Sequence, residues 1–198
     1  MEYCLTIDSL SKKYRKFVAL NDVTMRVPQG AIYGLIGKNG AGKTTLIRII
    51  CGLQSPTAGT YSIYDAPYSS KEIYKSRRRM GGIIESPALY GNMSAKENLK
   101  HQFLLLGKPS FDEIDKLLES VDLKDAGKKP VRNFSLGMRQ RLAIAMALAS
   151  DPDFVVLDEP INGLDPQGIV EIREIILKLN KERNITFLIS SHILDELS

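Results

Sequence analysis

The 198-residue sequence contains no tryptophan, two histidines and two cysteines. Cys4 and Cys51 are too few for a disulfide framework and lack the spacing of metal ligands, which fits a reducing compartment. No apolar run approaches the ~18 residues that a membrane-spanning helix needs. The first residues also lack the basic start and apolar stretch of a secretory signal. From these absences we expect a chain that neither spans a membrane nor is secreted.

The composition is that of a globular protein, because 43% of the residues are apolar and 25% are charged. At ~150 residues per domain, the length predicts one domain, or one domain with a subdomain. The net charge of +4 is compatible with nucleic acid, an anionic membrane or phosphate ligands, although a solvated surface is the simplest interpretation. The densest basic run, 75–79, has few aromatic residues around it. We therefore interpret it as a solvated helix face near the membrane or the phosphates, and not as a nucleic acid site.

Short β-branched runs alternate with helical patterns along the chain, which predicts an α/β fold with a largely parallel sheet. Buried strands are expected at 31–36, 154–157 and 185–189. The N-terminal segment 3–27 alternates in polarity, which predicts antiparallel strands at the edge. A helix is expected at 43–51, ended by Gly52.

The middle of the chain differs, since residues 86–150 are expected to form helices only. The expected helices are 94–106, which opens with a capping box, 111–121 and 135–149. A further helix, after this segment, begins at the N-cap Asp165. The sequence thus predicts an α/β core of residues 1–85 and 151–198 with an inserted helical subdomain, 86–150.

The strongest local signal is Gly-Lys-Asn-Gly-Ala-Gly-Lys-Thr at 37–44, a P-loop pattern between an expected strand and helix. Its glycines let backbone N–H groups curl around phosphate oxygens, and the helix N-terminus adds a positive dipole. Lys43 is expected to reach the β- and γ-phosphates, and the Thr44 hydroxyl to bind Mg²⁺. The predicted nucleotide contacts are Gly37, Lys38, Asn39, Gly40, Ala41, Gly42, Lys43, Thr44 and Thr45.

A second signal is the strand 154–157, which ends in two carboxylates, Asp158 and Glu159. In a P-loop protein, Asp158 is expected to hold Mg²⁺, usually through water, and Glu159 to polarise the attacking water. Without the P-loop, a solvated acidic turn would be the simpler interpretation. With the P-loop, the paired acids favour hydrolysis over phosphoryl transfer.

The third signal is Asn-Phe-Ser-Leu-Gly-Met-Arg-Gln-Arg at 133–141. A P-loop, then Ser-x-Gly-x-Arg-Gln-Arg, then a strand ending in Asp-Glu-Pro resembles the nucleotide-binding subunit of ATP-binding cassette (ABC) transporters over nearly the whole chain. The resemblance implies a P-loop NTPase core of RecA-like fold. Ser135 is expected to cap a helix whose N-terminus faces a γ-phosphate, and Gly137 to permit close approach. Residues 135–138 lack the second glycine and the glutamine of the commonest signature.

Further positions take roles through the same resemblance. Residues 162–165 match the D-loop, which contacts a partner subunit in this family. His192 matches the switch histidine at the γ-phosphate, so Lys43, Glu159 and His192 are the predicted catalytic residues. Tyr14 matches the aromatic residue that stacks on adenine, although Phe17 lies close in the sequence.

Glu85 is the main departure from the family pattern, because most members have a glutamine there whose carbonyl touches Mg²⁺. A carboxylate still binds Mg²⁺, but it adds negative charge beside the γ-phosphate. Together with 87–90 and the signature 134–138, Glu85 resembles the subgroup that exports lantibiotics and bacitracin-like peptides for self-immunity or resistance. The alternative is a neutral substitution in an exporter of another substrate.

The resemblance implies an ATPase that drives transport through a separate transmembrane permease, in the cytoplasm on the inner face of the cell membrane. Two such subunits, identical or homologous, are expected to dimerise head-to-tail. Each ATP then lies between one P-loop and the Ser135 and Gly137 of the other subunit. No nucleic acid partner is expected. The alternatives are an ABC-type ATPase without a permease, a small-molecule kinase and a binding module; the signature and His192 count against the kinase.

The last residues give a further expectation. A helix is expected to start near Ile193, and the chain ends at Ser198, whereas family members continue well beyond the switch histidine. We therefore expect the sequence to be shortened at its C-terminus.

Overall fold

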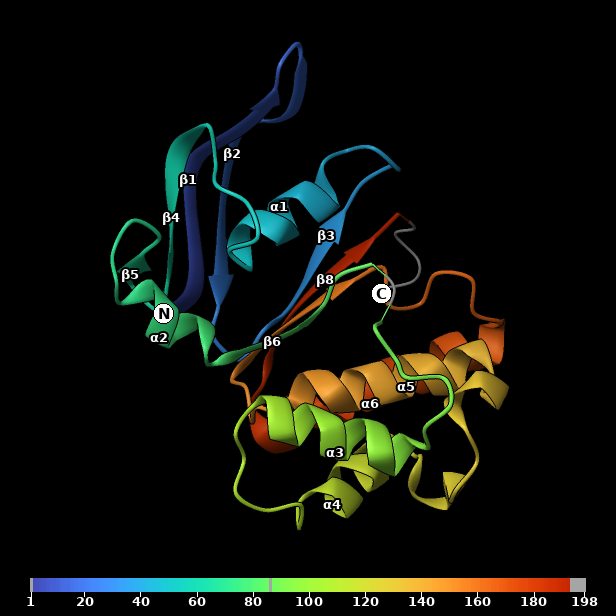
Figure 1. Cartoon of the computed structure of the whole chain (residues 1–198). Helices are drawn as coiled ribbons and strands as arrows, with labels where there is room; N and C mark the ends of the chain where they lie inside the picture. Colours follow the sequence, from blue (N-terminus) through green and yellow to red (C-terminus); the bar gives the residue numbers. More distant parts are fainter. Residues whose placement is uncertain (1, 86, 193–198) are drawn as a thin grey trace.

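The computed structural model describes residues 2–85 and 87–192, so the helix expected from Ile193 lies outside the described residues (Figure 1). The described strands form two sheets of four strands each, one antiparallel and one parallel. Helix α1 (Lys43–Ile50) is enclosed between them, because its apolar side chains share one buried cluster with side chains of both sheets. In this part of the chain, no helix is long and apolar enough to cross a membrane.

The antiparallel sheet has the strand order β2-β1-β4-β5. Its strands are β1 (Tyr3–Tyr14), β2 (Phe17–Pro28), β4 (Ala58–Ile63) and β5 (Ala66–Pro67). The antiparallel strands predicted for 3–27 are confirmed, since β1 and β2 form a hairpin in which Tyr14 pairs with Phe17. They belong to a sheet of their own, completed by β4 and β5, which the residue pattern did not predict.

The parallel sheet has the strand order β3-β8-β7-β6. Its strands are β3 (Ile32–Ile36), β6 (Met80–Ile83), β7 (Phe154–Asp158) and β8 (Thr186–Ser191). The central strands β7 and β8 are buried at every position, as predicted. The prediction that 31–36 is buried is wrong, because Ile32 is 39% exposed and Ile36 is 44% exposed. Strand β3 lies at the sheet edge, where less of the protein covers it than covers a central strand.

The helices follow β3, β5, β6 and β7 along the chain. Besides α1, they are α2 (Ile73–Arg77), α3 (Ala95–Leu105), α4 (Ile114–Ser120), α5 (Leu136–Leu148) and α6 (Pro166–Arg183), with short 3₁₀ turns at Lys124–Ala126 and Val131–Asn133. The predicted N-caps are present: Ser94 forms a capping box with Glu97, and Asp165 accepts a hydrogen bond from the Gly168 N–H. Helix α4 is shorter than the predicted 111–121, and Phe111 lies before its first turn.

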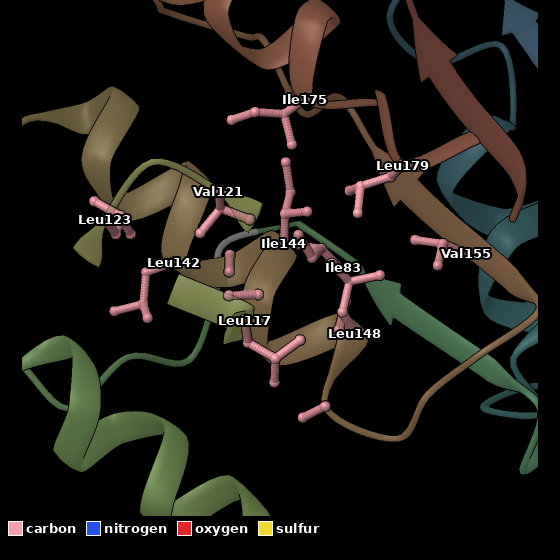
Figure 2. Close-up of a cluster of buried hydrophobic side chains, with 14 of the residues drawn as sticks. Ile83, Leu117, Val121, Leu123, Leu142, Ile144, Leu148, Val155, Ile175 and Leu179 are labelled. Atoms are coloured by element: carbon pink, nitrogen blue, oxygen red, sulfur yellow. The ribbon is translucent and has the colours of Figure 1, made fainter. Parts of the chain in front are cut away.

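Between β6 and β7, the regular elements of the described residues are all helices, as predicted for 86–150. Helix α5 lies at their centre and is buried on most sides, with α4 on one flank and β6, β7 and α6 on the other (Figure 2). Figure 2 shows Ile144 and Leu148 of α5 pointing toward Ile83 of β6 and Ile175 of α6. These helices are therefore packed firmly onto the parallel sheet. The division into a core and a helical subdomain stays a prediction.

The basic run 75–79 is only in part the solvated helix face that we predicted. Arg77 donates hydrogen bonds to the Ile50 carbonyl at 3.3 Å and to the Tyr61 hydroxyl at 2.5 Å. Arg79 forms an ion pair with Asp153 at 2.7 Å. For Arg77 the prediction is wrong, because its hydrogen bonds connect α2 to α1 and β4. Arg79 pairs with Asp153 but stays solvated, since its side chain is 49% exposed. Lys75 and Arg78 are exposed.

Candidate nucleotide site

The P-loop, residues 37–42, connects β3 to α1 at the carboxyl end of the parallel sheet. Gly40 and Gly42 have φ angles of 84° and 92°, which favour glycine. A Cβ atom on Gly42 would lie 2.4 Å from the Ala19 carbonyl oxygen, so a side chain does not fit there. Gly42 is the N-cap of α1 and has no side chain to cap its first N–H groups. These groups therefore form a site suited to an anion.

The other residues of the predicted P-loop contacts lie around this helix terminus. Lys38, Asn39, Gly40 and Ala41 are exposed, and Lys43, Thr44 and Thr45 are the first three residues of α1. The Gly37 N–H donates to the Ser191 carbonyl at 3.1 Å, which fixes the loop to the end of β8. All nine predicted contacts thus belong to one loop and the first turn of one helix.

Lys43 is largely buried, and its ammonium group is held from two sides. Its Nζ donates to the Gly37 carbonyl at 2.5 Å and lies 3.0 Å from Oε1 of Glu159. The second carboxylate oxygen of Glu159 lies 2.7 Å from Nδ1 of His192. The structure therefore brings together the three predicted catalytic residues, which lie on α1, after β7 and after β8.

The electrostatic environment of Glu159 favours its charged form. Burial alone would raise the pKa of this carboxyl group, but the hydrogen bonds with His192 and Lys43 outweigh burial and lower the pKa below its ordinary value. The backbone of Glu159 has a φ of 52°, which is uncommon outside glycine, and its N–H donates to Ser190 Oγ at 2.8 Å. Glu159 is thus fixed through both its side chain and its backbone.

Thr44 and Asp158 meet beside this cluster. The Thr44 hydroxyl donates to Oδ2 of Asp158 at 2.7 Å, and the Ser190 hydroxyl donates to Oδ1 at 2.6 Å. Hydroxyl and carboxylate oxygens are ligands that Mg²⁺ accepts, together with water and phosphate oxygens. The pair therefore fits a Mg²⁺ ion that is completed by a nucleotide. Within residues 2–85 and 87–192, no group of three or more His, Cys, Asp or Glu side chains forms a metal cluster of its own.

Glu85, the third predicted metal ligand, lies apart from this pair. Its carboxylate forms an ion pair with the guanidinium of Arg48 on α1, and its side chain is 60% exposed. The backbone of Glu85 has a φ of 61°, in the left-handed region. The structure thus joins two of the three predicted metal ligands and holds the third against an arginine that we did not predict.

The signature residues lie at the N-terminus of α5, in the helical part of the molecule (Figure 1). Ser135 caps α5 by accepting a hydrogen bond from the Met138 N–H at 3.2 Å, as predicted. Gly137 does not have a positive φ, and a Cβ there would meet Leu164 no closer than 3.9 Å. The fold of this chain therefore does not require glycine at 137. Since Leu164 is the nearest side chain to that position, the signature lies next to the predicted D-loop.

Tyr14 lies at the tip of the β1–β2 hairpin and is 40% exposed. Its hydroxyl donates to Gln54, and Lys12 Nζ lies 5.1 Å from its ring centroid. Phe17, its partner across the hairpin, is 61% exposed. Both rings are accessible for stacking, so the choice between them stays a prediction.

Comparison with known proteins shows that these features belong to one protein family. A sequence model of the family described as ABC transporter matches residues 20–162. The chain belongs to the ABC transporter family. It is 47% identical to the lantibiotic transport ATP-binding protein SrtF of Streptococcus pyogenes, over 98% of this chain and 82% of that protein. It is 46% identical to the bacitracin transport ATP-binding protein BcrA of Bacillus licheniformis, over 100% of this chain.

The predicted likeness to the bacitracin and lantibiotic subgroup of ABC proteins is thus confirmed. The chain spans 64% of the length of BcrA. Among solved ABC structures, cbiO1 of Clostridium perfringens, part of the transporter complex cbiONQ, matches with a TM-score of 0.87 and 31% identity, over 100% of this chain and 81% of that one. A dimeric structure of the ATP-binding cassette MJ0796 bound to ADP and Pi matches with a TM-score of 0.82 and 25% identity, over 98% of this chain and 90% of that one. The ABC ATPase fold is therefore confirmed.

Two residues of this ABC site were missed by sequence reasoning. Ser190 is fully buried and contacts both the Asp158 carboxylate and the Glu159 backbone. The available signal was a polar residue at the end of an otherwise apolar strand. It was missed because the nearby histidine is the predicted functional residue of this segment. Arg48 gave no signal, because a basic residue in the last turn of a helix is common. His101 packs edge-on against Tyr90, with 4.5 Å between the ring centroids, and is not part of this site.

Proposed function

We propose that this cassette binds Mg·ATP and hydrolyses it to ADP and phosphate to power an exporter of the bacitracin and lantibiotic type. The observation that carries the proposal is the Glu159 carboxylate, which contacts the P-loop lysine through one oxygen and His192 through the other. A carboxylate at this point is within reach of a water molecule that attacks a phosphate held by Lys43. The ABC relatives named for bacitracin and lantibiotic transport support the same function.

In this proposal, Lys43 and the N–H groups at the start of α1 bind phosphate oxygens. The water oxygen forms a bond to the γ-phosphorus while the bond to the bridging oxygen of ADP breaks, and Glu159 accepts the proton of the water. His192 holds the carboxylate in place through its Nδ1. Thr44 and Asp158 hold Mg²⁺, which neutralises charge on the phosphates when it is bound. The lowered pKa of Glu159 keeps it deprotonated, as a base must be.

We further propose that two cassettes pair head-to-tail, so that Ser135 and Gly137 of one face the nucleotide of the other. Gly137 supports this arrangement, because a side chain there would fit the fold of a single chain. The N–H groups at the start of α5, next to the Ser135 cap, are suited to a γ-phosphate. The dimeric MJ0796 structure shows that an ABC cassette of similar fold forms dimers.

A groove between β6, α3 and α5 is the proposed docking site of the permease, on the cytoplasmic face of the membrane. It has a volume of about 980 Å³ and is lined by apolar side chains that include Ile84, Leu105 and Met146. Arg78 and Lys108 also line it and give it positive charge. The neighbouring surface of α3 is apolar, since Leu105 is 71% exposed. A permease helix with an apolar face and acidic flanks matches this groove.

A crosslinking experiment on the full-length protein tests the permease proposal. A photoreactive residue at Leu105 is expected to capture a hydrophobic membrane subunit in native cells. The same residue at Leu177, which is 56% exposed on α6, is the matched control and is expected to capture none. Equal capture from both sites, or none from either in cells that express the protein, would favour an ABC-type ATPase without a permease. Sequencing the captured subunit distinguishes a peptide exporter from an exporter of another substrate.

A further inference from the structure

The ion pair between Arg48 and Glu85 joins two elements of the proposed ATP site that are far apart in sequence. Arg48 lies in the last turn of α1, and Glu85 lies in the loop after β6. The contact is made between Nη2 of Arg48 and Oε1 of Glu85, with side chains that are 35% and 60% exposed. Of the three predicted metal ligands, Thr44 and Asp158 contact each other, and Glu85 contacts Arg48 instead.

The position of Arg48 on α1 relates it to the metal site. Arg48 follows Thr44 by four residues, so both lie on the same face of the helix, about 6 Å apart along its axis. On the sheet, Ile83 pairs with Leu157, the residue before Asp158. The backbone therefore brings Glu85 to the edge of the sheet where Asp158 lies, while its carboxylate pairs with Arg48, one helical turn beyond Thr44 on α1.

The negative charge of Glu85 affects how the site binds a nucleotide and a cation. Asp158 and Glu159 already place two carboxylates at the end of β7, and a third would repel both them and the phosphates of a nucleotide. A guanidinium beside Glu85 offsets that repulsion. A divalent cation at Thr44 and Asp158 attracts the same carboxylate, so the cation and Arg48 act on Glu85 in opposite directions.

We propose that Arg48 is a positioning residue that competes with Mg²⁺ for the Glu85 carboxylate. The inference rests on the proposed function, since it takes Mg·ATP as the ligand. Exposed ion pairs are weak, which suits a contact that a bound cation breaks, and loss of such a pair corresponds to a change of about 2- to 5-fold in an equilibrium constant. Arg48 thereby sets how strongly the site prefers the magnesium complex over the free nucleotide.

The test is a double-mutant cycle read out by binding of a non-hydrolysable ATP analogue to the full-length protein. The variants are Arg48→Gln, Glu85→Gln and the two combined, each titrated in excess MgCl₂ and again in EDTA. We expect Arg48→Gln to tighten binding of the magnesium complex by about 2- to 5-fold. In EDTA it is expected not to tighten binding, because the uncompensated charge of Glu85 then repels the phosphates. In the Glu85→Gln background, Arg48→Gln is expected to have no effect. Arg48→Lys keeps the charge and is expected to behave like the parent protein.

Three results would overturn the inference: an equal effect of Arg48→Gln with and without Mg²⁺, an equal effect in both backgrounds, or weaker binding of the magnesium complex. Thermal melting of each variant shows that it is folded before it is titrated. The proposed function fails differently, because then the parent protein itself binds no nucleotide. Binding by the parent without the selective effect of Arg48→Gln rejects the role of Arg48 alone.

Discussion

Lys43 and Glu159 form a largely buried ion pair, with 3.0 Å between Nζ and Oε1 and side chains that are 8% and 20% exposed. One residue belongs to the P-loop helix and the other follows a strand more than one hundred positions later. The pair connects the proposed phosphate-binding group directly to the proposed base. A phosphate at Lys43 therefore arrives next to the group that activates water.

Glu159→Gln is expected to abolish turnover while keeping nucleotide binding. Glutamine has nearly the same shape and still forms hydrogen bonds, but it does not accept a proton from water. We expect steady-state ATP hydrolysis by the full-length protein to fall by about 10²- to 10⁴-fold, with an unchanged affinity for ATP. Glu182→Gln, at an exposed position of α6, is the matched control and should retain full activity. Hydrolysis that survived Glu159→Gln would contradict the assignment of the base.

The lowered pKa of Glu159 predicts a pH-dependent contribution to stability. Since the folded-state pKa lies below the unfolded value of about 4.3, the contribution is fully present above that value. It is lost as the pH falls through the folded-state pKa. The parent protein should therefore exceed Glu159→Gln in free energy of unfolding at pH 7, and this difference should shrink below about pH 4. Urea titrations between pH 7 and pH 3 measure it, and a constant difference would argue against the ion pair and hydrogen bond as its source.

Gly81→Ala is expected to destabilise the protein where β6 passes the end of α5. A Cβ at this position would lie 2.1 Å from the carbonyl oxygen of Ala147, which is backbone and has little freedom to move. We expect a loss of about 1–3 kcal/mol in the free energy of unfolding. Urea unfolding of both proteins is the measurement. An unchanged midpoint would mean that the strand and helix separate easily.

Gly137→Ala is expected to do the opposite, keeping stability while impairing hydrolysis. A Cβ there has only ordinary contacts within one chain, and alanine favours the helix by about 0.5–1 kcal/mol over glycine. In the proposed dimer, however, the methyl group meets the nucleotide of the partner cassette. Hydrolysis should fall by about 5- to 150-fold if the clash costs about 1–3 kcal/mol. Full activity of a stable Gly137→Ala protein would rule out close approach at this glycine.

Much of the site could be predicted because its signals are local. The P-loop, the paired acids and His192 each follow an apolar strand, and parallel strands end at the same edge of a sheet. Other features depend on neighbours that a local pattern does not reveal. The apolar run 31–36 predicts a buried strand, yet β3 lies at the edge of the sheet and is partly exposed. The basic run predicts a solvated Arg77, because the partner that holds this arginine, Tyr61, lies elsewhere in the chain.

Glu85 shows a third kind of limit, set by the backbone. The sequence identifies the residue type, but in the structure Glu85 has a left-handed φ of 61° and pairs with Arg48. Such a conformation is rare for glutamate, so no pattern of residue types predicts it.

The contacts of the Ser190 hydroxyl predict how substitutions in strand β8 act. It contacts Asp158 and the Glu159 backbone, while the next residue on the same strand, Ser191, receives the N–H of Gly37, and His192 follows. Strand β8 therefore contacts the proposed metal ligand, the proposed base and the phosphate-binding loop. A lesion in this strand shifts all of them at once. Substitutions in β8 should therefore impair nucleotide affinity and hydrolysis rate together, whereas substitutions in α1 and β7 should separate the two effects.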